Sequence, residues 1–270
     1  TLNFNNKDVR ITTHYYEKNI LSSIFSTIHE GGHAIYEQQI DDIVSETVLG
    51  EGTSMGIHES QSRIFENMFG RNINFLKNIF NKFDELFDVR SKGIEVEDFY
   101  KIVNTVSKSL IRIEADELTY PIHIMIRYEL EKEIFSNLEE IESSEYIDYL
   151  ANKWADMYEE FLGVRPTTNS EGILQDVHWS SGLFGYFPSY ALGSAYAAQI
   201  YNSMNKEFSI EENLSNGNFD NINSFLKDKI HKFGKSKTPN ELLILATGEA
   251  FNPDYYINYL KEKYRKIYGI

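Results

Sequence analysis

The chain has 270 residues, enough to bury a full hydrophobic core, and its 41% hydrophobic and 25% charged residues are ordinary for a globular protein. A formal net charge of −15 disfavours nucleic acid or an anionic membrane as a partner, because both require clustered lysine and arginine. The absence of cysteine excludes disulfides, thiolate metal sites and cysteine nucleophiles, and it suits a reducing compartment such as the cytoplasm, where we expect this protein.

Apolar residues recur at three- and four-residue steps along most of the chain, which predicts a mainly α-helical fold. Thr53 or Ser54 is expected to cap the second helix, and Thr238 a later one. The helices expected in chain order cover residues 18–40, 54–69, 72–88, 96–115, 122–138, 144–162, 189–206, 220–233, 239–248 and 253–267.

Three segments depart from this helical pattern. Residues 8–15 and 45–49 are rich in β-branched side chains and are predicted to be strands that form a small sheet beside the first helix. Residues 163–188 combine glycine, serine and aromatic residues without helical periodicity, and a loop of this length inside a compact domain is usually functional. No apolar run approaches the length of a membrane span, and the first ten residues lack the apolar segment of a signal peptide.

The segment His29-Glu30-Gly31-Gly32-His33 is an H-E-x-x-H motif inside the first predicted helix. Residues four apart lie on one face of an α-helix, so both imidazoles reach a single Zn²⁺, and Glu30 is predicted to take a proton from water that the zinc activates. Each glycine costs about 1 kcal/mol of helix propensity relative to alanine, which indicates that another part of the chain approaches closely there. The alternative is a chance match with two surface histidines.

A third metal ligand must come from another element, and Glu59 in the second predicted helix is the candidate. Arg63 lies one turn further on, where it would hold the carboxylate. The alternative is a solvated Glu59–Arg63 ion pair, but the short, glycine-containing connection from the first helix favours the ligand. His58 is expected to pack or to support a ligand, because a catalytic zinc keeps one position for water.

Five blocks of sequence resemble the M32 metallocarboxypeptidases, of the carboxypeptidase Taq type, in that family's order: DVRIT at residues 8–12, HEGGH at 29–33, HESQ at 58–61, IRIEAD at 111–116 and GILQDVHW at 172–179. The resemblance implies a mainly α, gluzincin-like helical peptidase with a deep groove, one zinc per chain and a tendency to form homodimers. It also implies that C-terminal residues are removed from peptides with broad side-chain tolerance. The ligands it implies are His29, His33 and Glu59.

Family members are longer and carry a helical region before the DVRIT-like block. Residues 1–270 are therefore expected to be the catalytic metallopeptidase domain, the C-terminal part of a longer protein. Zinc is the expected ion, with Co²⁺ or Mn²⁺ as substitutes that the ligand types do not exclude.

A carboxypeptidase must bind a free C-terminal carboxylate, which arginine does best through paired hydrogen bonds. Arg112, in the IRIEAD block, is the first candidate for this contact and Arg10 the second. The alternative is that Arg112 pairs with Asp116 one helical turn away and stabilises only a helix. Both roles are compatible if Asp116 positions the guanidinium.

His178 lies in the long irregular segment, and Tyr186 and Tyr190 follow it. A histidine or a tyrosine hydroxyl in such a loop can stabilise the oxyanion of peptide hydrolysis, a layout similar to the thimet-oligopeptidase and angiotensin-converting groups of helical zinc peptidases. Asp176 is expected to orient His178 or the neighbourhood of Trp179 rather than to act directly. The alternative for all of these residues is core packing. The three remaining histidines, His14, His123 and His231, have no motif around them and are expected to be structural.

Three functions fit these features. The first is a zinc carboxypeptidase whose partners are peptides with a free C-terminus. The second is a helical zinc oligopeptidase or endopeptidase with the same metal site and no bound substrate carboxylate. The third is an inactive zinc-binding piece of a larger assembly, because loss of the preceding helical region would expose apolar helix faces.

Overall fold

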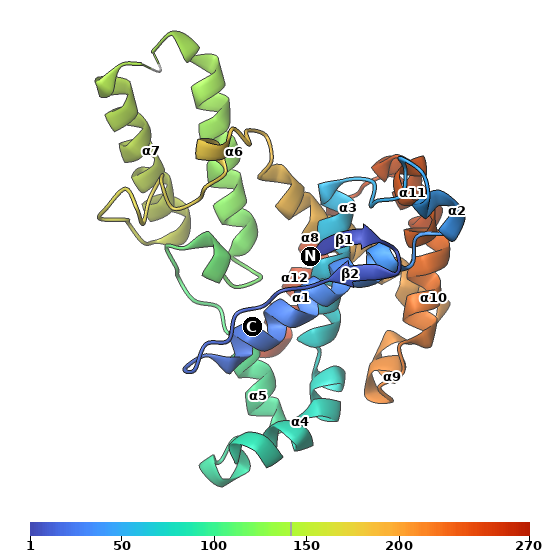
Figure 1. Ribbon diagram of the computed structural model, residues 1–270. Helices are drawn as coiled ribbons and strands as arrows, with labels where there is room; N and C mark the ends of the chain where they lie inside the picture. Colours follow the sequence, from blue (N-terminus) through green and yellow to red (C-terminus); the bar gives the residue numbers. More distant parts are fainter. Residues whose placement is uncertain (141) are drawn as a thin grey trace. The chain divides into compact units, whose positions relative to one another are not determined.

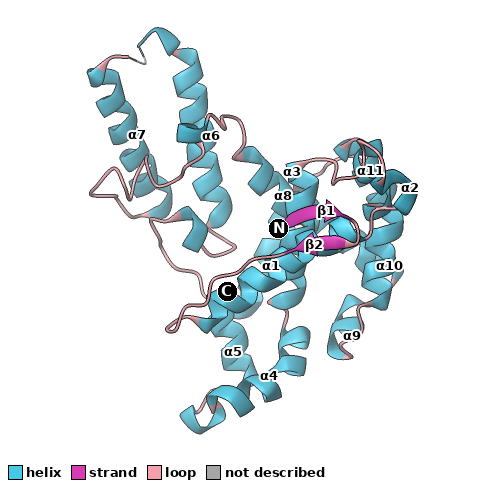
Figure 2. Ribbon diagram, viewed as in Figure 1, coloured by secondary structure: helices cyan, strands magenta, loops and turns pink. Residues whose placement is uncertain are grey.

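The computed structural model describes residues 1–140 and 142–270, and this chain divides into two compact units (Figures 1 and 2). The larger unit comprises Thr1–Asn104 and Leu192–Ile270, and the smaller one Thr105–Ala191. Both are built mainly of helices, so the predicted fold class is confirmed. None of the described helices is long and apolar enough to cross a membrane.

The larger unit holds a two-stranded sheet and most of the helices. Its elements are β1 (Leu2–Asn5), β2 (Asp8–Arg10), α1 (Ile20–Gln38), α2 (Asp42–Ser45), α3 (Met55–Arg63), a π-helix (Ile64–Gly70), α4 (Ile73–Phe87), α5 (Val96–Val103), the part of α8 (Pro188–Glu207) from Leu192 onward, α9 (Ile210–Ser215), α10 (Asp220–Lys229), α11 (Pro239–Thr247) and α12 (Asp254–Tyr268). The smaller unit holds α6 (Tyr120–Ser136), α7 (Ser144–Leu162) and 3₁₀ turns at Arg112–Glu114 and Trp179–Ser181.

Helices α1 and α3 form the centre of the larger unit. Asn19 caps α1 by accepting a hydrogen bond from the backbone N–H of Ser22, and Ser54, one of the two predicted residues, caps α3 in the same way. Phe25 of α1 packs into an apolar cluster with α4 and α5. Beyond Arg63 the helix continues as the π-helix, and both α3 and this π-helix lie against α1.

The small sheet lies beside α1 as predicted, but one of its strands differs from the prediction. β2 pairs antiparallel with β1, and Asn5 accepts from the backbone N–H groups of Lys7 and Asp8 to form the turn between them. The predicted strand at 45–49 is wrong: residues 42–45 are helical and 46–49 form turns. Val48 is 93% exposed, so its β-branched side chain has no sheet surface to pack on.

One predicted helix needs correction, and one short helix was missed. The helix predicted over 96–115 ends at Val103, because the side chain of Asn104 bonds the backbone oxygens of Tyr100 and Arg71 and so competes with helix continuation. The chain then enters the smaller unit. Helix α9 was not predicted; it is six residues long and begins after the capping residue Ser209.

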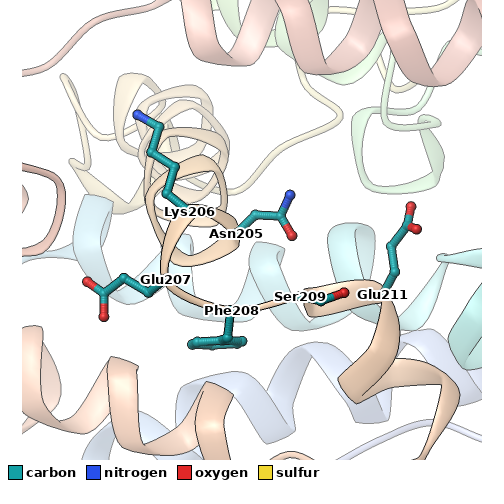
Figure 3. Close-up of a pocket in the computed structure, with 6 residues that line it drawn as sticks. All are labelled: Asn205, Lys206, Glu207, Phe208, Ser209 and Glu211. Carbon is teal, nitrogen blue, oxygen red and sulfur yellow. The ribbon is translucent and has the colours of Figure 1, made fainter.

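A surface cavity of about 360 Å³ lies where α8 passes into α9 (Figure 3). It contains none of the residues predicted to act in catalysis or metal binding. Its lining consists of Asn205, Lys206, Glu207, Phe208, Ser209 and Glu211.

In the smaller unit, α6 and α7 pack around Trp154 and Tyr158, both of which are buried. The segment 163–188 contains no α-helix before Pro188, as predicted, and its Trp179 packs against this core. His123 is buried beside Tyr158, with its Nδ1 2.9 Å from the phenolic oxygen. Its place in the core fits the structural role expected for it.

His231, also expected to be structural, joins α1 to α3: it is fully buried, with its ring nitrogens 2.8 Å from the side-chain amides of Gln39 and Gln61. Burial, together with the nearby His58, lowers the pKa of His231 to about 3, against 6.5 in an unfolded chain. Between these values the unfolded state binds a proton that the folded state does not, so stability falls as the pH drops from about 6.5 towards 3.

We therefore expect His231→Gln to be less stable than the parent protein at pH 7 but to lose stability less steeply below pH 6.5. The parent's extra slope should approach about 1.4 kcal/mol per pH unit. Urea unfolding at a series of pH values measures it. Parallel pH profiles for the two proteins would contradict this role of His231.

Candidate metal centre

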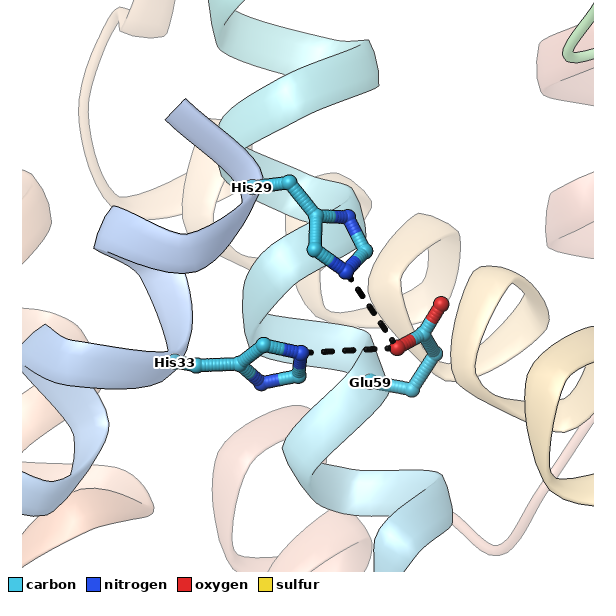
Figure 4. A group of neighbouring side chains, drawn as sticks. All are labelled: His29, His33 and Glu59. Carbon is cyan, nitrogen blue, oxygen red and sulfur yellow. Dashed lines mark ion pairs between the residues drawn. The ribbon is translucent and has the colours of Figure 1, made fainter. Parts of the chain in front are cut away.

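Three side chains from two packed helices converge in the larger unit (Figure 4). His29 and His33 lie one turn apart on α1, and their Nε2 atoms are 3.7 and 3.6 Å from Oε2 of Glu59 on α3. All three ligand atoms lie within 4.8 Å of one another. Four ligands placed tetrahedrally at 2.0–2.1 Å from a zinc ion lie about 3.4 Å apart, so this donor set fits a divalent metal. It is the one such group among the described residues.

Local contacts orient the Glu59 carboxylate. The Nε of Arg63 donates to Oε1 at 2.7 Å, as expected from the sequence, and the Ser62 hydroxyl donates to Oε2 at 3.2 Å. Burial alone would raise the pKa of Glu59, but the charge of Arg63, followed by the two histidines, more than offsets it and holds the pKa at about 2. The group is therefore ionised at neutral pH, as a metal ligand must be.

The outer nitrogens of both histidines are also engaged. The Nδ1 of His29 lies 3.0 Å from Glu66 on the π-helix, and the Nδ1 of His33 lies 2.5 Å from Nδ1 of His58. His58 in turn places its Nε2 2.7 Å from Glu37. His58 thus supports a candidate ligand, as predicted. Glu66 and Glu37 were missed; Glu66 lies in the π-helix, whose register an α-helical pattern does not predict.

Burial would raise the pKa of Glu66, but its hydrogen bond with His29 and the charges of Arg63 and Arg71 hold that pKa far below the usual range. Its side chain is only 13% exposed. Glu66 is thus a fixed negative charge behind His29.

Glu30, the predicted base, lies next to His29 on α1 and is not part of the three-residue group. Its side chain is 23% exposed, so the carboxylate reaches the surface of the unit. A carboxylate in this place can exchange protons with a molecule that approaches the group.

Glycines allow the helices to meet around this centre. A Cβ on Gly193 of α8 would lie 2.6 Å from Cβ of Glu59, closer than carbon atoms can approach. We therefore expect Gly193→Ala to push the Glu59 side chain away from the histidines, lowering the unfolding free energy by about 1–3 kcal/mol and weakening metal binding. Urea unfolding and competition with a chelator would measure the two effects; unchanged zinc affinity would contradict the placement of Glu59.

Arg112 lies in the smaller unit, buried beside Asp176. Its Nε and Nη2 donate to Oδ1 of Asp176 at 3.0 and 2.7 Å, and its Nη1 donates to the Tyr120 hydroxyl at 3.1 Å. The alternative pairing with Asp116 is wrong, because the Asp116 carboxylate instead accepts from backbone N–H groups that follow it, including that of Thr119.

Arg127, which the sequence analysis missed, binds the other oxygen of Asp176 at 2.7 Å and is fully buried. Asp176 therefore joins two arginines. The predicted orienting role of Asp176 towards His178 or the neighbourhood of Trp179 stays a prediction beside this pairing.

His178 packs among aromatic side chains of the same unit. Its ring lies 4.4 Å from that of Phe187 and 5.5 Å from that of Tyr186, between centroids, and its Nε2 is 3.1 Å from the Tyr190 hydroxyl. Burial, reinforced by the charge of Arg112, lowers the pKa of His178, which favours the neutral ring. The structure thus brings the three residues predicted to stabilise an oxyanion together.

Arg10 lies in the larger unit at the end of β2, away from any buried cluster. Its guanidinium pairs with Asp8 at 2.8 Å, its side chain is 65% exposed, and it lies over the ring of Phe4. Exposure leaves it accessible to a ligand.

The chain is similar to several known proteins. The family model described as carboxypeptidase Taq (M32) metallopeptidase matches residues 1–264. "Carboxypeptidase 1" of Bacillus subtilis is 49% identical over 265 residues, which are 98% of this chain and 52% of that protein. "Thermostable carboxypeptidase 1" of Thermus thermophilus is 42% identical over 264 residues, 97% of this chain and 50% of that protein.

Solved structures give the same result. The M32 carboxypeptidase from Deinococcus radiodurans matches with a TM-score of 0.92 and 38% identity, over 98% of this chain and 53% of that one. A Pyrococcus furiosus carboxypeptidase matches with a TM-score of 0.90 and 41% identity, over 97% and 52%. The chain spans about half the length of the curated relatives it matches. This chain belongs to the carboxypeptidase Taq (M32) metallopeptidase family.

Proposed function

We propose that this chain is the catalytic part of a zinc-dependent metallocarboxypeptidase that releases C-terminal amino acids from peptides with broad specificity. The convergence of His29, His33 and Glu59 is the observation that carries this proposal, together with membership of the family. Two imidazoles and a carboxylate form a donor set that suits zinc and leaves a fourth position open. Co²⁺ and Mn²⁺ accept the same ligands and are expected to substitute.

A metal ion held by this group supplies Lewis-acid chemistry, polarising a carbonyl oxygen and lowering the pKa of water. Glu30 is the general base that takes the proton from the attacking water and the acid that passes it to the leaving amine. Its position beside His29 and its partial exposure support this role. His178, with Tyr186 or Tyr190, would donate hydrogen bonds to the developing oxyanion, and the Tyr190 hydroxyl next to the neutral imidazole supports that pairing.

The substrate's terminal carboxylate would be bound by Arg112, with Arg10 as the second candidate. Arg112 donates three hydrogen bonds, to Asp176 and Tyr120, and a guanidinium has five N–H groups in all. Asp176, itself bound by Arg127, orients the guanidinium of Arg112, which favours paired hydrogen bonds to a planar carboxylate.

We expect a peptide with a free C-terminus to be cleaved with a kcat/KM about 10- to 100-fold higher than its C-terminally amidated twin, because the amide removes one charge-assisted hydrogen-bonded contact. Mass spectrometry of the released products measures this. N-terminal acetylation of the same peptide is the matched control and should change little.

Metal analysis of the purified chain accompanies this comparison. One zinc per chain with sequential C-terminal release supports the proposal. Equal cleavage of the free and amidated peptides would favour the oligopeptidase alternative. One zinc without any cleavage would favour an inactive zinc-binding piece, and failure to bind zinc would contradict the ligand assignment.

The remaining assignments complete the proposal. Residues 1–270 together would serve as one catalytic domain, in a cytoplasmic homodimer that acts on peptides and binds neither nucleic acid nor membrane. The net charge of −15 supports the last point. Light scattering of the purified chain measures the oligomeric state, and a monomer at micromolar concentration would contradict the homodimer.

A further inference from the structure

Each candidate ligand histidine has one nitrogen directed at Glu59 and the other at a protein partner. In both rings Nε2 lies 3.6–3.7 Å from the Glu59 carboxylate, so Nδ1 is the nitrogen that is available to the surroundings. A neutral imidazole carries a proton on only one nitrogen, and a metal requires the unprotonated one. The partner of Nδ1 therefore determines whether Nε2 can bind a metal.

For His29 the partner is a carboxylate. Glu66 lies 3.0 Å from Nδ1 of His29 and is held by Arg71 at 3.1 Å and by Arg63 at 3.5 Å. A carboxylate only accepts hydrogen bonds, so Nδ1 of His29 must carry a proton, which leaves Nε2 as the nitrogen for a metal. This is the familiar arrangement in which a carboxylate orients a metal-binding histidine.

For His33 the partner is another histidine, which by itself leaves the proton's position open. The second contact of His58 determines the position of the proton, because Nε2 of His58 lies 2.7 Å from Oε1 of Glu37. Glu37 is buried, and its carboxylate also accepts from the backbone N–H of Gly52 at 3.0 Å and from the amide of Asn3 at 2.8 Å. Nε2 of His58 must therefore carry the proton that is donated to Glu37.

The position of the proton on His33 follows because a neutral His58 carries only one ring N–H proton. With its proton on Nε2, neutral His58 offers only a lone pair at Nδ1, which lies 2.5 Å from Nδ1 of His33. His33 must then donate from Nδ1, which leaves Nε2, 3.6 Å from Glu59, as the nitrogen for a metal. The proton of His33 is thus fixed by a carboxylate that does not touch it.

We propose that Glu37 and His58 are positioning residues that form a relay to His33, and that this relay holds His33 in the tautomer that binds a metal through Nε2. The inference rests on the proposed metal centre. The two ligand histidines are thus oriented in different ways. Glu66, on the π-helix, contacts His29 directly, whereas Glu37 acts on His33 through the ring of His58.

The tautomers can be read directly from ¹⁵N–¹H correlation spectra of the metal-free protein with ¹⁵N-labelled histidine, of which the chain has seven. In the parent protein we expect His33 to be protonated on Nδ1, with its signal identified by its loss in His33→Asn. Glu37→Gln and His58→Phe should each populate the other tautomer. Glu66→Gln should disturb His29 and leave the His33 tautomer unchanged.

Zinc affinity, measured by competition with a chelator, gives the second reading. Glu37→Gln and His58→Phe should each raise the Kd about 10- to 100-fold. His58→Asn keeps an oxygen acceptor near the position of Nδ1 and should recover part of that loss. Glu51→Gln, at an exposed carboxylate paired with Lys235, is the matched control and should leave both readings unchanged.

A parent protein with His33 protonated on Nε2 would overturn the inference, and so would an unchanged tautomer and Kd in both relay variants. If those variants fail to fold, the spectrum of the parent protein still shows which nitrogen of His33 carries the proton and so tests the inference. Neither measurement uses a peptide substrate. A failure of the relay is therefore distinguishable from a failure of the proposed carboxypeptidase activity.

Discussion

Glu30→Gln is expected to bind one zinc per chain and to lose about 10²- to 10⁴-fold in kcat, the usual contribution of a general base. The amide keeps the size of the side chain but cannot take the proton from the attacking water. Glu30 lies outside the group formed by His29, His33 and Glu59, so the variant should retain the ligand set intact.

Metal analysis and peptide release measured on the same preparation separate the two effects. Glu17→Gln is a suitable control, because Glu17 is an exposed glutamate just before α1. Full activity of Glu30→Gln would remove Glu30 from the mechanism. Loss of zinc from it would mean that the residue acts on the metal site and not on the water.

Gly32→Ala is expected to disrupt the contact between α1 and α3 and to lower the unfolding free energy by about 3 kcal/mol or more. A Cβ on Gly32 would lie 2.6 Å from the backbone oxygen of Gln61 and 2.8 Å from Cα of Ser62. Because these are backbone atoms, the two helices themselves must separate. That separation also moves Glu59 away from the histidines, so zinc affinity should fall with stability.

Gly31→Ala is the matched comparison, one residue earlier on the same helix. A Cβ there meets no described heavy atom within 4 Å, beyond its own helix and neighbours. Alanine should therefore stabilise α1 through its helix propensity, by up to about 1 kcal/mol. Urea unfolding of both variants tests the pair, and equal effects of the two substitutions would contradict the helix packing.

Gly31 and Gly32 show which contacts of the first helix could be predicted from the sequence. Their cost in a helix indicated a close approach by another segment, and for Gly32 that approach exists. The pattern did not reveal that Gly31 has no such neighbour, because consecutive residues of a helix face different directions. Spacing along one helix likewise placed His29 and His33 on one face, since that relation depends only on helical geometry.

Contacts between distant segments could not be obtained in the same way. Arg112 was assigned Asp116 as an alternative partner because that residue is one helical turn away, but the segment is not an α-helix and the partner is Asp176. Glu37 was overlooked because its role depends on a ring contributed by α3. The strand predicted at 45–49 failed because β propensity depends on having a surface to pack against.

The π-helix at Ile64–Gly70 has a consequence for how this protein can vary in length. A π-turn holds more residues than an α-turn, so removing one residue would allow the segment to wind as a regular α-helix. Every side chain after the deletion would then rotate about the helix axis, and the carboxylate of Glu66 would no longer reach His29. Substitutions on the outer face of this stretch leave that register intact, whereas an insertion or deletion changes it. Natural variation here should therefore alter residue identity while conserving the number of residues between Glu59 and Arg71.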